Sequence, residues 1–233
     1  PLRRQRQMCI RDSDNASPQG YGEVWHFFEQ QLQYPITQIS MNRLNDRTLD
    51  QFDVLILPPG YYSNFASKDS ELLKWIRKGG RIIALGSAVR ALEGHDSLSL
   101  QLKENSDNTN AQNIPFAEEE RNDISSAIYG SIYAVDVDTT HPLAFGYDKH
   151  YYSLKNSEVS YSFLDGGSVG KLPKNSKPLA GFSGSKATKL QSESLVFGME
   201  NLGRGSVVYI VDNPLYRGFW ENGKLWVINA VFH

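Results

Sequence analysis

The sequence predicts an α/β protein with a parallel sheet covered by helices on both faces. First, two apolar runs read as strands buried on both faces, namely 52–60 (FDVLILPPG) and 81–86 (RIIALG). Second, segments with apolar residues at helical spacing alternate with these runs. Third, the apolar run 206–211 (SVVYIV) precedes a C-terminal helical pattern. This alternation is typical of a doubly wound arrangement.

The first half of the chain places its elements at short intervals. Apolar residues at helical spacing follow a Ser-Pro-Gln-Gly turn, and the next segment alternates as a strand does. A later helical segment closes on two glycines, which suit a helix C-terminus. The predicted elements are, in order, helix 21–32, strand 35–41, strand 52–60, helix 68–80, strand 81–86 and helix 87–92.

The second half changes in character. Residues 93–123 are polar and poor in large apolar side chains, which predicts a surface excursion, either a linker or a lid. Short β-like segments follow, namely 128–138, 158–164, 177–184 and 193–200. We expect strand 206–211 and helix 223–232 to rejoin the sheet. The predicted fold is a flavodoxin-like parallel sheet with added β-rich segments in the second half.

The head of the chain stands apart from the rest. Residues 3–13 (RRQRQMCIRDS) contain four arginines and the only cysteine. Read as protein, they form a basic tail or an arm for phosphates. Read backwards into codons, they resemble the transposon-end adapter used in preparing sequencing libraries. We therefore expect 1–13 to be non-native and 14–233 to be the domain. Residues 7–12 should fill a strand position or be disordered, with no function for Cys9.

Composition excludes several classes of function. Residues 1–13 hold four of the 24 basic residues and one of the 26 acidic residues, so 14–233 carry a net charge of −5. This gives no electrostatic reason to bind nucleic acid. No apolar run approaches the roughly 18 residues of a transmembrane helix, so we expect no membrane span. Without Cys9, thiol nucleophiles, disulfides and thiolate zinc sites are also excluded.

His26 and Glu29 are the most tempting metal ligands. His-x-x-Glu on a helix places two ligands on one face. A catalytic zinc usually needs a third protein ligand, and nothing marks His95, His141 or His150 for that role. The aromatic neighbours of His26 favour a packed amphipathic helix, so we assign no metal ligand in this chain.

The segment RIIALGSAVRAL offers Ser87 as a candidate nucleophile. A sharp turn at Gly86 would lift this residue to the carboxyl end of the sheet. A hydrolase would also need a histidine base and a supporting carboxylate, and no sequence signal supplies them. The alternative is that Ser87 caps the helix that follows.

A second candidate region is VDNPLYRGFWENGK, residues 211–224. Its mixture of polar and aromatic side chains suits the rim of a cleft and an anchored loop equally well. A binding module predicts an open cleft at the carboxyl ends of the strands. The residues expected at that cleft are Gly60, Tyr61, Gly86, Ser87, Asp212, Asn213 and Trp220.

Five stretches together resemble a known family: GEVWHFFEQQ, FDVLILPPGYY, LLKWIRKGGRIIALGSAVRAL, THPLAFGY and GRGSVVYIVDNPLYRGFWENGKLWVINAVF. They resemble the C-terminal domain of a group of bacterial zinc carboxypeptidases, which is similar to class I glutamine amidotransferases. The resemblance covers 14–233. In active amidotransferases the turn carries a cysteine nucleophile and a late strand supplies a histidine. Here these positions offer Gly86 or Ser87, and Asp212 with Asn213, so thiol chemistry should be absent.

The resemblance implies a secreted or periplasmic peptidase whose zinc-binding domain lies upstream of Asp14. We expect 14–233 to be a non-catalytic accessory domain, without a cofactor, that packs on that domain or presents substrate to it. Two alternatives stay open: a hydrolase that uses Ser87, and a carbohydrate- or peptidoglycan-binding module. The expected partners are the upstream peptidase domain and a peptide or glycan ligand.

Overall fold

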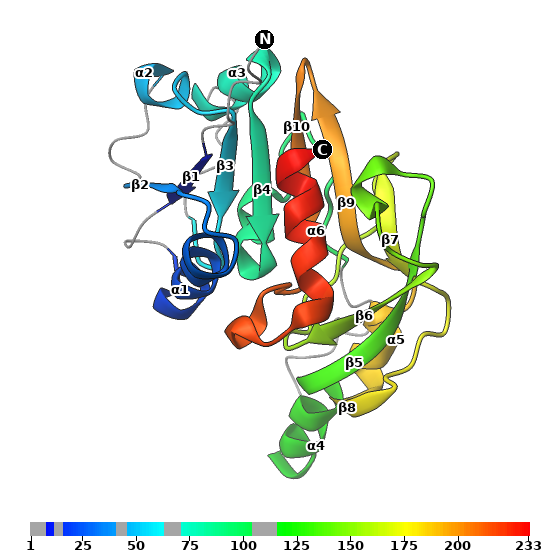
Figure 1. Ribbon diagram of the computed structural model, residues 1–233. Helices are drawn as coiled ribbons and strands as arrows, with labels where there is room; N and C mark the ends of the chain where they lie inside the picture. Colours follow the sequence, from blue (N-terminus) through cyan, green and yellow to red (C-terminus); the bar gives the residue numbers. More distant parts are fainter. Residues whose placement is uncertain (1–7, 12–15, 41–45, 63–70, 104–115) are drawn as a thin grey trace.

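The computed structural model describes residues 8–11, 16–40, 46–62, 71–103 and 116–233 (Figure 1). The strands in these ranges are β1 (Met8–Arg11), β2 (Thr37–Ile39), β3 (Val54–Leu57), β4 (Arg81–Leu85), β5 (Ile128–Val137), β6 (His150–Lys155), β7 (Ser168–Leu172), β8 (Ala180–Ser183), β9 (Ser194–Leu202) and β10 (Gly205–Ile210). The helices are α1 (Pro18–Trp25), η1 (His26–Gln31), α2 (Asp46–Leu49), α3 (Glu71–Lys78), η3 (Gly86–Leu92), α4 (Phe116–Ser126), η5 (Pro142–Ala144), α5 (Ser185–Gln191), η6 (Tyr216–Gly218) and α6 (Glu221–Phe232).

The strands form a mixed sheet. The parallel part has the order β2-β1-β3-β4-β10. From β10 onward, β9, β7, β5 and β6 continue the sheet in antiparallel pairs, and β8 pairs with β5. This second part curls away from the first, as Figure 1 shows. The α/β class is therefore confirmed, but the parallel, flavodoxin-like description does not extend to the sheet as a whole.

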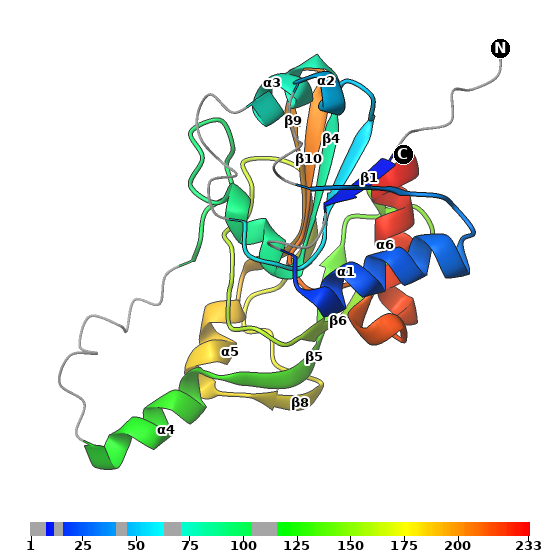
Figure 2. The same ribbon diagram turned by 90° about the vertical axis from the view of Figure 1, so that its left-hand side faces the viewer.

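Two apolar cores cover the two faces of the parallel strands. On one face lie α1 and α6 (Figure 2). Together with η1 they contribute buried side chains such as Phe28 and Trp226. On the other face, α3 and η3 contribute side chains such as Trp75 and Val89. Successive residues of β3 and β4 enter opposite cores, which explains why these strands read as continuous apolar runs. Strand β10 lies parallel beside β4, so the late segments rejoin the sheet as expected.

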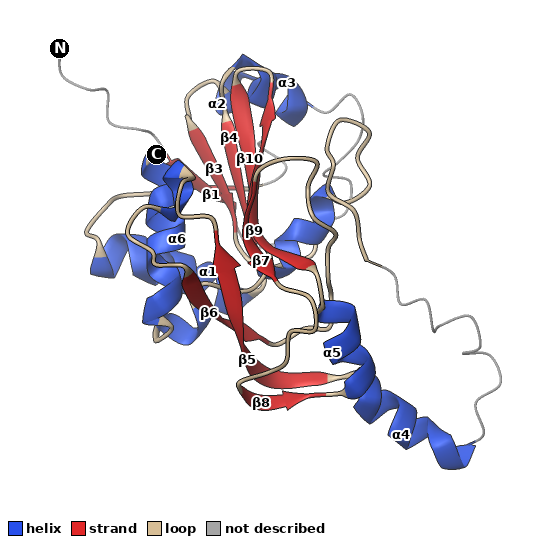
Figure 3. Ribbon diagram, turned by 90° about the vertical axis from the view of Figure 1, so that its right-hand side faces the viewer, coloured by secondary structure: helices blue, strands red, loops and turns tan. Residues whose placement is uncertain are grey.

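Several predicted elements need correction. The helix predicted at 21–32 is an α-helix that continues as the π-helix η1, and the helix predicted at 87–92 is the 3-10 helix η3. The β-like segment 158–164 is not a strand, because its backbone pairs with 101–103 and makes only isolated bridges at Tyr161. Strands β6 and β7 and helix α5 were not predicted. Helix α5 packs against α4 beside β5 and β8 (Figure 3).

The polar excursion is described only in part. Its central residues, 104–115, lie outside the described ranges, as do residues 63–70, which include the start of the predicted helix 68–80. The end of the excursion is helical, because α4 begins at Phe116. Within the ranges that the structure covers, no helix is both long and apolar enough to cross a bilayer.

The head of the chain supplies a strand. Strand β1 lies between β2 and β3, with Cys9 in register with Thr37 and Leu55. This is the first of the two outcomes expected for residues 7–12. That residues 1–13 are non-native, and that Cys9 has no function, stay predictions.

Candidate functional site

A cleft of about 340 Å³ opens where the parallel strands β3, β4 and β10 end. Its lining comes from the segments that follow these strands, from the end of β6 and the segment after it, and from η6. The lining residues are Pro59, Tyr61, Gly86, Ser87, Arg90, Leu154, Asn156, Ser157, Glu158, Val159, Tyr161, Val211, Asp212, Asn213 and Tyr216. Ligands of α/β proteins bind at this edge of a sheet, so the cleft is the candidate site.

The turn after β4 presents Ser87 to the cleft. Gly86 has a φ of 54°, which favours glycine, and a Cβ built there would lie 3.3 Å from Pro59 Cγ. Ser87 follows as the second residue of η3 and is exposed. It does not cap this helix, because Leu85 precedes η3 and no side-chain cap bond forms. Ser87 therefore lines the cleft and has no capping role.

Asp212, two residues after the end of β10, lines the cleft and forms a buried ion pair there. Its Oδ1 lies 3.1 Å from Lys155 Nζ, and its Oδ2 accepts a hydrogen bond from Ser153 Oγ. The side chain of Lys155 is 0% exposed and that of Asp212 is 9% exposed. Ser153 and Lys155 share the buried face of β6, so the antiparallel part of the sheet holds this carboxylate at the end of the parallel part.

Asn213 is held by a second buried carboxylate. Its Nδ2 donates to Glu23 Oε2 at 2.6 Å, and its Oδ1 accepts from the backbone N–H of Leu215 at 3.1 Å. Glu23 Oε1 also accepts from the backbone N–H of Arg217, at 2.6 Å, and from the Gln19 amide. Helix α1 thereby fixes the loop that carries η6, where Arg217 has a left-handed φ of 49°.

The structure brings together five of the seven residues expected at a ligand cleft, namely Tyr61, Gly86, Ser87, Asp212 and Asn213. Gly60 is not part of the lining; it is buried and bridges to Ala16. Trp220, at the start of α6, is not part of it either, and the aromatic side chain that this loop adds to the lining is Tyr216.

Arg90, Lys155 and Tyr161 were not predicted as residues of this region. Lys155 carried a usable signal, because a lysine in step with Tyr151 on an alternating strand falls on the buried face. Arg90 carried none, because an arginine on an exposed helix face is ordinary. Tyr161 carried none that separates a cleft residue from a core residue.

No histidine is among the described residues that line the cleft. All five lie in described residues, and none of them lines it. His26 is exposed, and Glu29 accepts the backbone N–H of Ile36 at 3.0 Å, so the His-x-x-Glu carboxylate holds a loop. Within the part of the chain that the structure describes, no group of three or more metal-ligating side chains converges.

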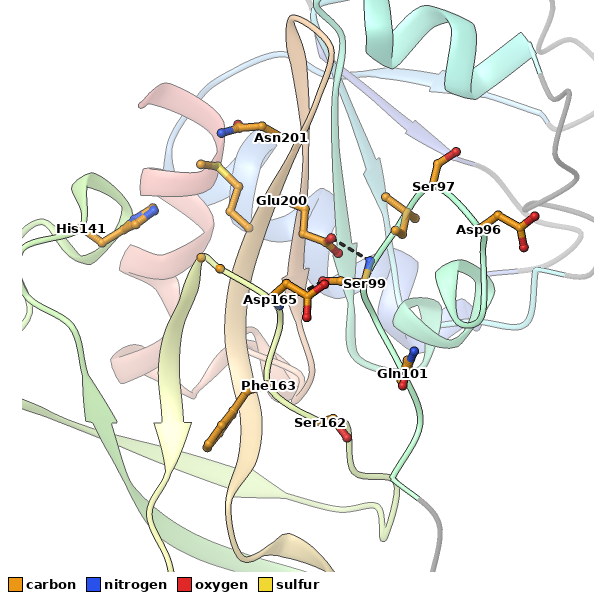
Figure 4. A pocket seen from close by; sticks show the side chains of 14 residues that line it. Asp96, Ser97, Ser99, Gln101, His141, Ser162, Phe163, Asp165, Glu200 and Asn201 are labelled. Carbon is orange, nitrogen blue, oxygen red and sulfur yellow. Dashed lines mark hydrogen bonds between the residues drawn. The ribbon is translucent and has the colours of Figure 1, made fainter.

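A wider hollow of about 790 Å³ lies elsewhere, between loop 96–101, segment 162–167 and the end of β9 (Figure 4). It shares no lining residue with the cleft. Its central carboxylate, Glu200, is engaged by the protein: it accepts from the N–H of Ser99 at 2.7 Å and from the hydroxyl of Tyr209 at 2.8 Å. These bonds use the Glu200 carboxylate to hold loop 96–101 on the sheet, which is a structural role. We therefore take the smaller cleft as the candidate site.

Comparison with known proteins places the fold. No protein-family model and no curated protein matches the sequence. Among solved structures, the chain is similar to a ThuA-like protein from Parabacteroides merdae, with a TM-score of 0.59, 10% identity, and coverage of 97% of this chain and 89% of that chain. It is also similar to a glutamine amidotransferase from Thermotoga maritima, with a TM-score of 0.56, 7% identity, and coverage of 91% and 77%.

A third similar structure is a β-galactosidase from Bacillus circulans, with a TM-score of 0.52 and 10% identity. Here the match covers 97% of this chain but only 30% of that enzyme. These likenesses concern the fold: the chain has an α/β fold similar to those of the ThuA-like protein and the glutamine amidotransferase.

Proposed function

We propose that this chain is a non-catalytic, amidotransferase-like accessory domain of a secreted or periplasmic zinc metallocarboxypeptidase, and that its cleft binds a ligand. The observation that carries the proposal is the pairing of Asp212 with Lys155 and Ser153. Asp212 stands at the end of the late strand, where the resemblance expects a catalytic histidine. Both of its carboxylate oxygens are engaged, so it is a structural group.

Ser87 also has no histidine beside it in the cleft that could act as its base. A serine nucleophile needs a positioned base, and none of the five histidines lines the cleft that contains Ser87. This favours binding over hydrolysis. Ser87 then serves as a hydrogen-bonding group for a ligand.

The accessory role draws support from the β-galactosidase match. The part of that enzyme that matches this chain makes up 30% of its length, so a similar fold occurs as one part of a larger hydrolase. The zinc of the proposed peptidase would belong to the upstream domain, with no cofactor in this one.

The experiment that tests the proposal starts from the contiguous gene. We expect the sequence before Asp14 to encode a carboxypeptidase domain with its own His-x-x-Glu and a distant histidine. The full protein should release C-terminal residues from peptides, lose this activity with a chelator, and keep it after Ser87→Ala. An upstream sequence without a peptidase domain would overturn the accessory role. Ester hydrolysis by the present chain that Ser87→Ala abolishes would establish the hydrolase instead.

A carbohydrate-binding module is the second candidate function. It is favoured by Tyr61, which lines the cleft and is 79% exposed, since exposed aromatic rings suit sugar faces. Binding of a neutral glycan that Tyr61→Ala abolishes would support this function, and unchanged binding by that variant would contradict it.

A further inference from the structure

Hydrogen-bond donors without an acceptor among the described residues line the cleft, and three of them come from η3 or are buried. They are the hydroxyl of Ser87, the guanidinium of Arg90 and the hydroxyl of Tyr161. Ser87 and Arg90 are both exposed, and no hydrogen bond or ion pair joins either side chain to another described residue. The cleft thus presents a surplus of donors.

Tyr161 is the unusual member of this group. The residue is only 2% exposed, yet it lines the cleft, and its hydroxyl has no partner among the described residues. Other buried tyrosines donate to acceptors: Tyr62 to Pro58 O at 2.7 Å and Tyr133 to Ser183 Oγ at 2.9 Å. The Tyr161 oxygen is not one of the fully enclosed polar atoms without a partner, so it is reachable from the cleft that the residue lines and can donate to an acceptor there.

The charges around the cleft narrow the class of ligand. Among the described lining residues Arg90 is the only cation, and the lining carboxylate of Asp212 is paired with Lys155, which lies outside the lining. Glu158 also lines the cleft, and Glu93 lies near Tyr161, but neither forms an ion pair with Arg90. These two acids would repel a doubly charged phosphate more than a singly charged group. A planar guanidinium also matches a carboxylate in bidentate geometry.

The hydroxyl of Tyr161 stays protonated at neutral pH. Burial raises the pKa of this hydroxyl, Glu93 raises it further, and Arg90 partly opposes the rise. The group therefore remains available as a donor. The volume of about 340 Å³ is at the small end for ligand sites, which suits a small molecule or the end of a chain.

We infer that the cleft binds a single carboxylate group, with Arg90 as its ion-pair partner and Tyr161 and Ser87 as hydrogen-bond donors. This inference rests on the proposed function, because it names the ligand chemistry of the same cleft. The carboxylate belongs either to a peptide C-terminus or to an acidic sugar.

Calorimetric titration of the chain with two matched pairs of probes tests the inference. One pair is an N-acetylated dipeptide with a free C-terminus and its C-terminal amide; the other is glucuronate and glucose. We expect at least one acid to bind at least tenfold more tightly than its neutral partner. The preferred acid identifies the source of the carboxylate.

Substitutions of the lining residues test whether the acid binds in this cleft. Arg90→Gln should weaken binding of the preferred acid about tenfold to a hundredfold, as expected for loss of a charge-assisted hydrogen bond. Tyr161→Phe, which keeps the ring, should weaken it about fivefold. The control is Arg121→Gln, an exposed arginine on α4, which should bind like the parent chain. Thermal unfolding of each variant establishes that it is folded.

The inference is overturned if neither acid binds at millimolar concentration, if acids and neutral partners bind alike, or if Arg90→Gln binds normally. Each of these results leaves the accessory role intact, because that role is decided by the upstream gene and the peptidase assay.

Discussion

The cleft has a floor whose charged groups are paired and a wall whose donors are free. The floor consists of Glu23, Lys155, Asp212 and Asn213. The wall consists of Ser87, Arg90 and Tyr161. Paired buried groups hold a fold together, because each would be costly alone, whereas unpaired groups at an opening contribute little to folding. The difference indicates that stability and ligand binding reside in separate residues of one site.

The most severe test of the floor is Lys155→Met. It leaves the Asp212 carboxylate buried without its cation, so we expect the free energy of unfolding to fall by about 3–5 kcal/mol. Urea denaturation followed by circular dichroism measures this. The double variant Lys155→Met/Asp212→Leu should recover most of the loss, because it removes both charges. A loss below about 1 kcal/mol for the single variant would show that the pair is not buried as described.

Glu23→Gln tests the second carboxylate of the floor. The amide offers one acceptor where the carboxylate oxygens now take bonds from Asn213, the Arg217 backbone and Gln19. We expect a loss of about 1–3 kcal/mol by the same denaturation assay. Glu119→Gln on the exposed face of α4 is the matched control and should lie within about 0.5 kcal/mol of the parent. Equal stability of both variants would contradict the proposed anchoring.

Gly86→Ala probes the turn that joins floor and wall. A left-handed φ of 54° should cost alanine about 1–2 kcal/mol, with crowding against Pro59 adding to it. Gly22→Ala in α1 is the control, since no atom lies within 4 Å of its added Cβ and alanine favours a helix. Denaturation midpoints should move in opposite directions. A Gly86→Ala variant as stable as the parent would contradict the view that this turn requires a glycine.

Tyr161→Phe should have the smallest effect on stability. It deletes a hydroxyl that has no partner, so we expect a change within about 0.5 kcal/mol. Tyr209→Phe, which removes a hydroxyl bonded to Glu200, should lose about 1 kcal/mol or more. If the two variants lose equal stability, the Tyr161 hydroxyl contributes to folding as the floor residues do. The distinction between a stabilising floor and a ligand-binding wall would then be wrong.

The fold was more predictable than the site. Strands β3, β4 and β10 and helices α3 and α6 were predicted close to their observed positions, because apolar runs and helical periodicity are local signals. Strands β6 and β7 were missed because neither contains a continuous apolar run: β6 alternates between exposed and buried residues, and β7 (SVGKL) is short with a glycine and a lysine in its middle. The segment 158–164 was wrongly predicted as β-like. Its aromatic residues resemble those of a strand, but Tyr161 packs in the core and lines the cleft instead.

The sequence by itself determined the α/β class, the buried strands and the place where Tyr61, Ser87 and Asp212 meet, since strand ends on one edge of a parallel sheet must lie close together. Only the tertiary structure decided which polar groups are paired. Lys155 and Asp212 are 57 residues apart, and Glu23 and Asn213 are 190 residues apart. No local pattern encodes such contacts, because they exist only after the curled half of the sheet and helix α1 have packed against the parallel half.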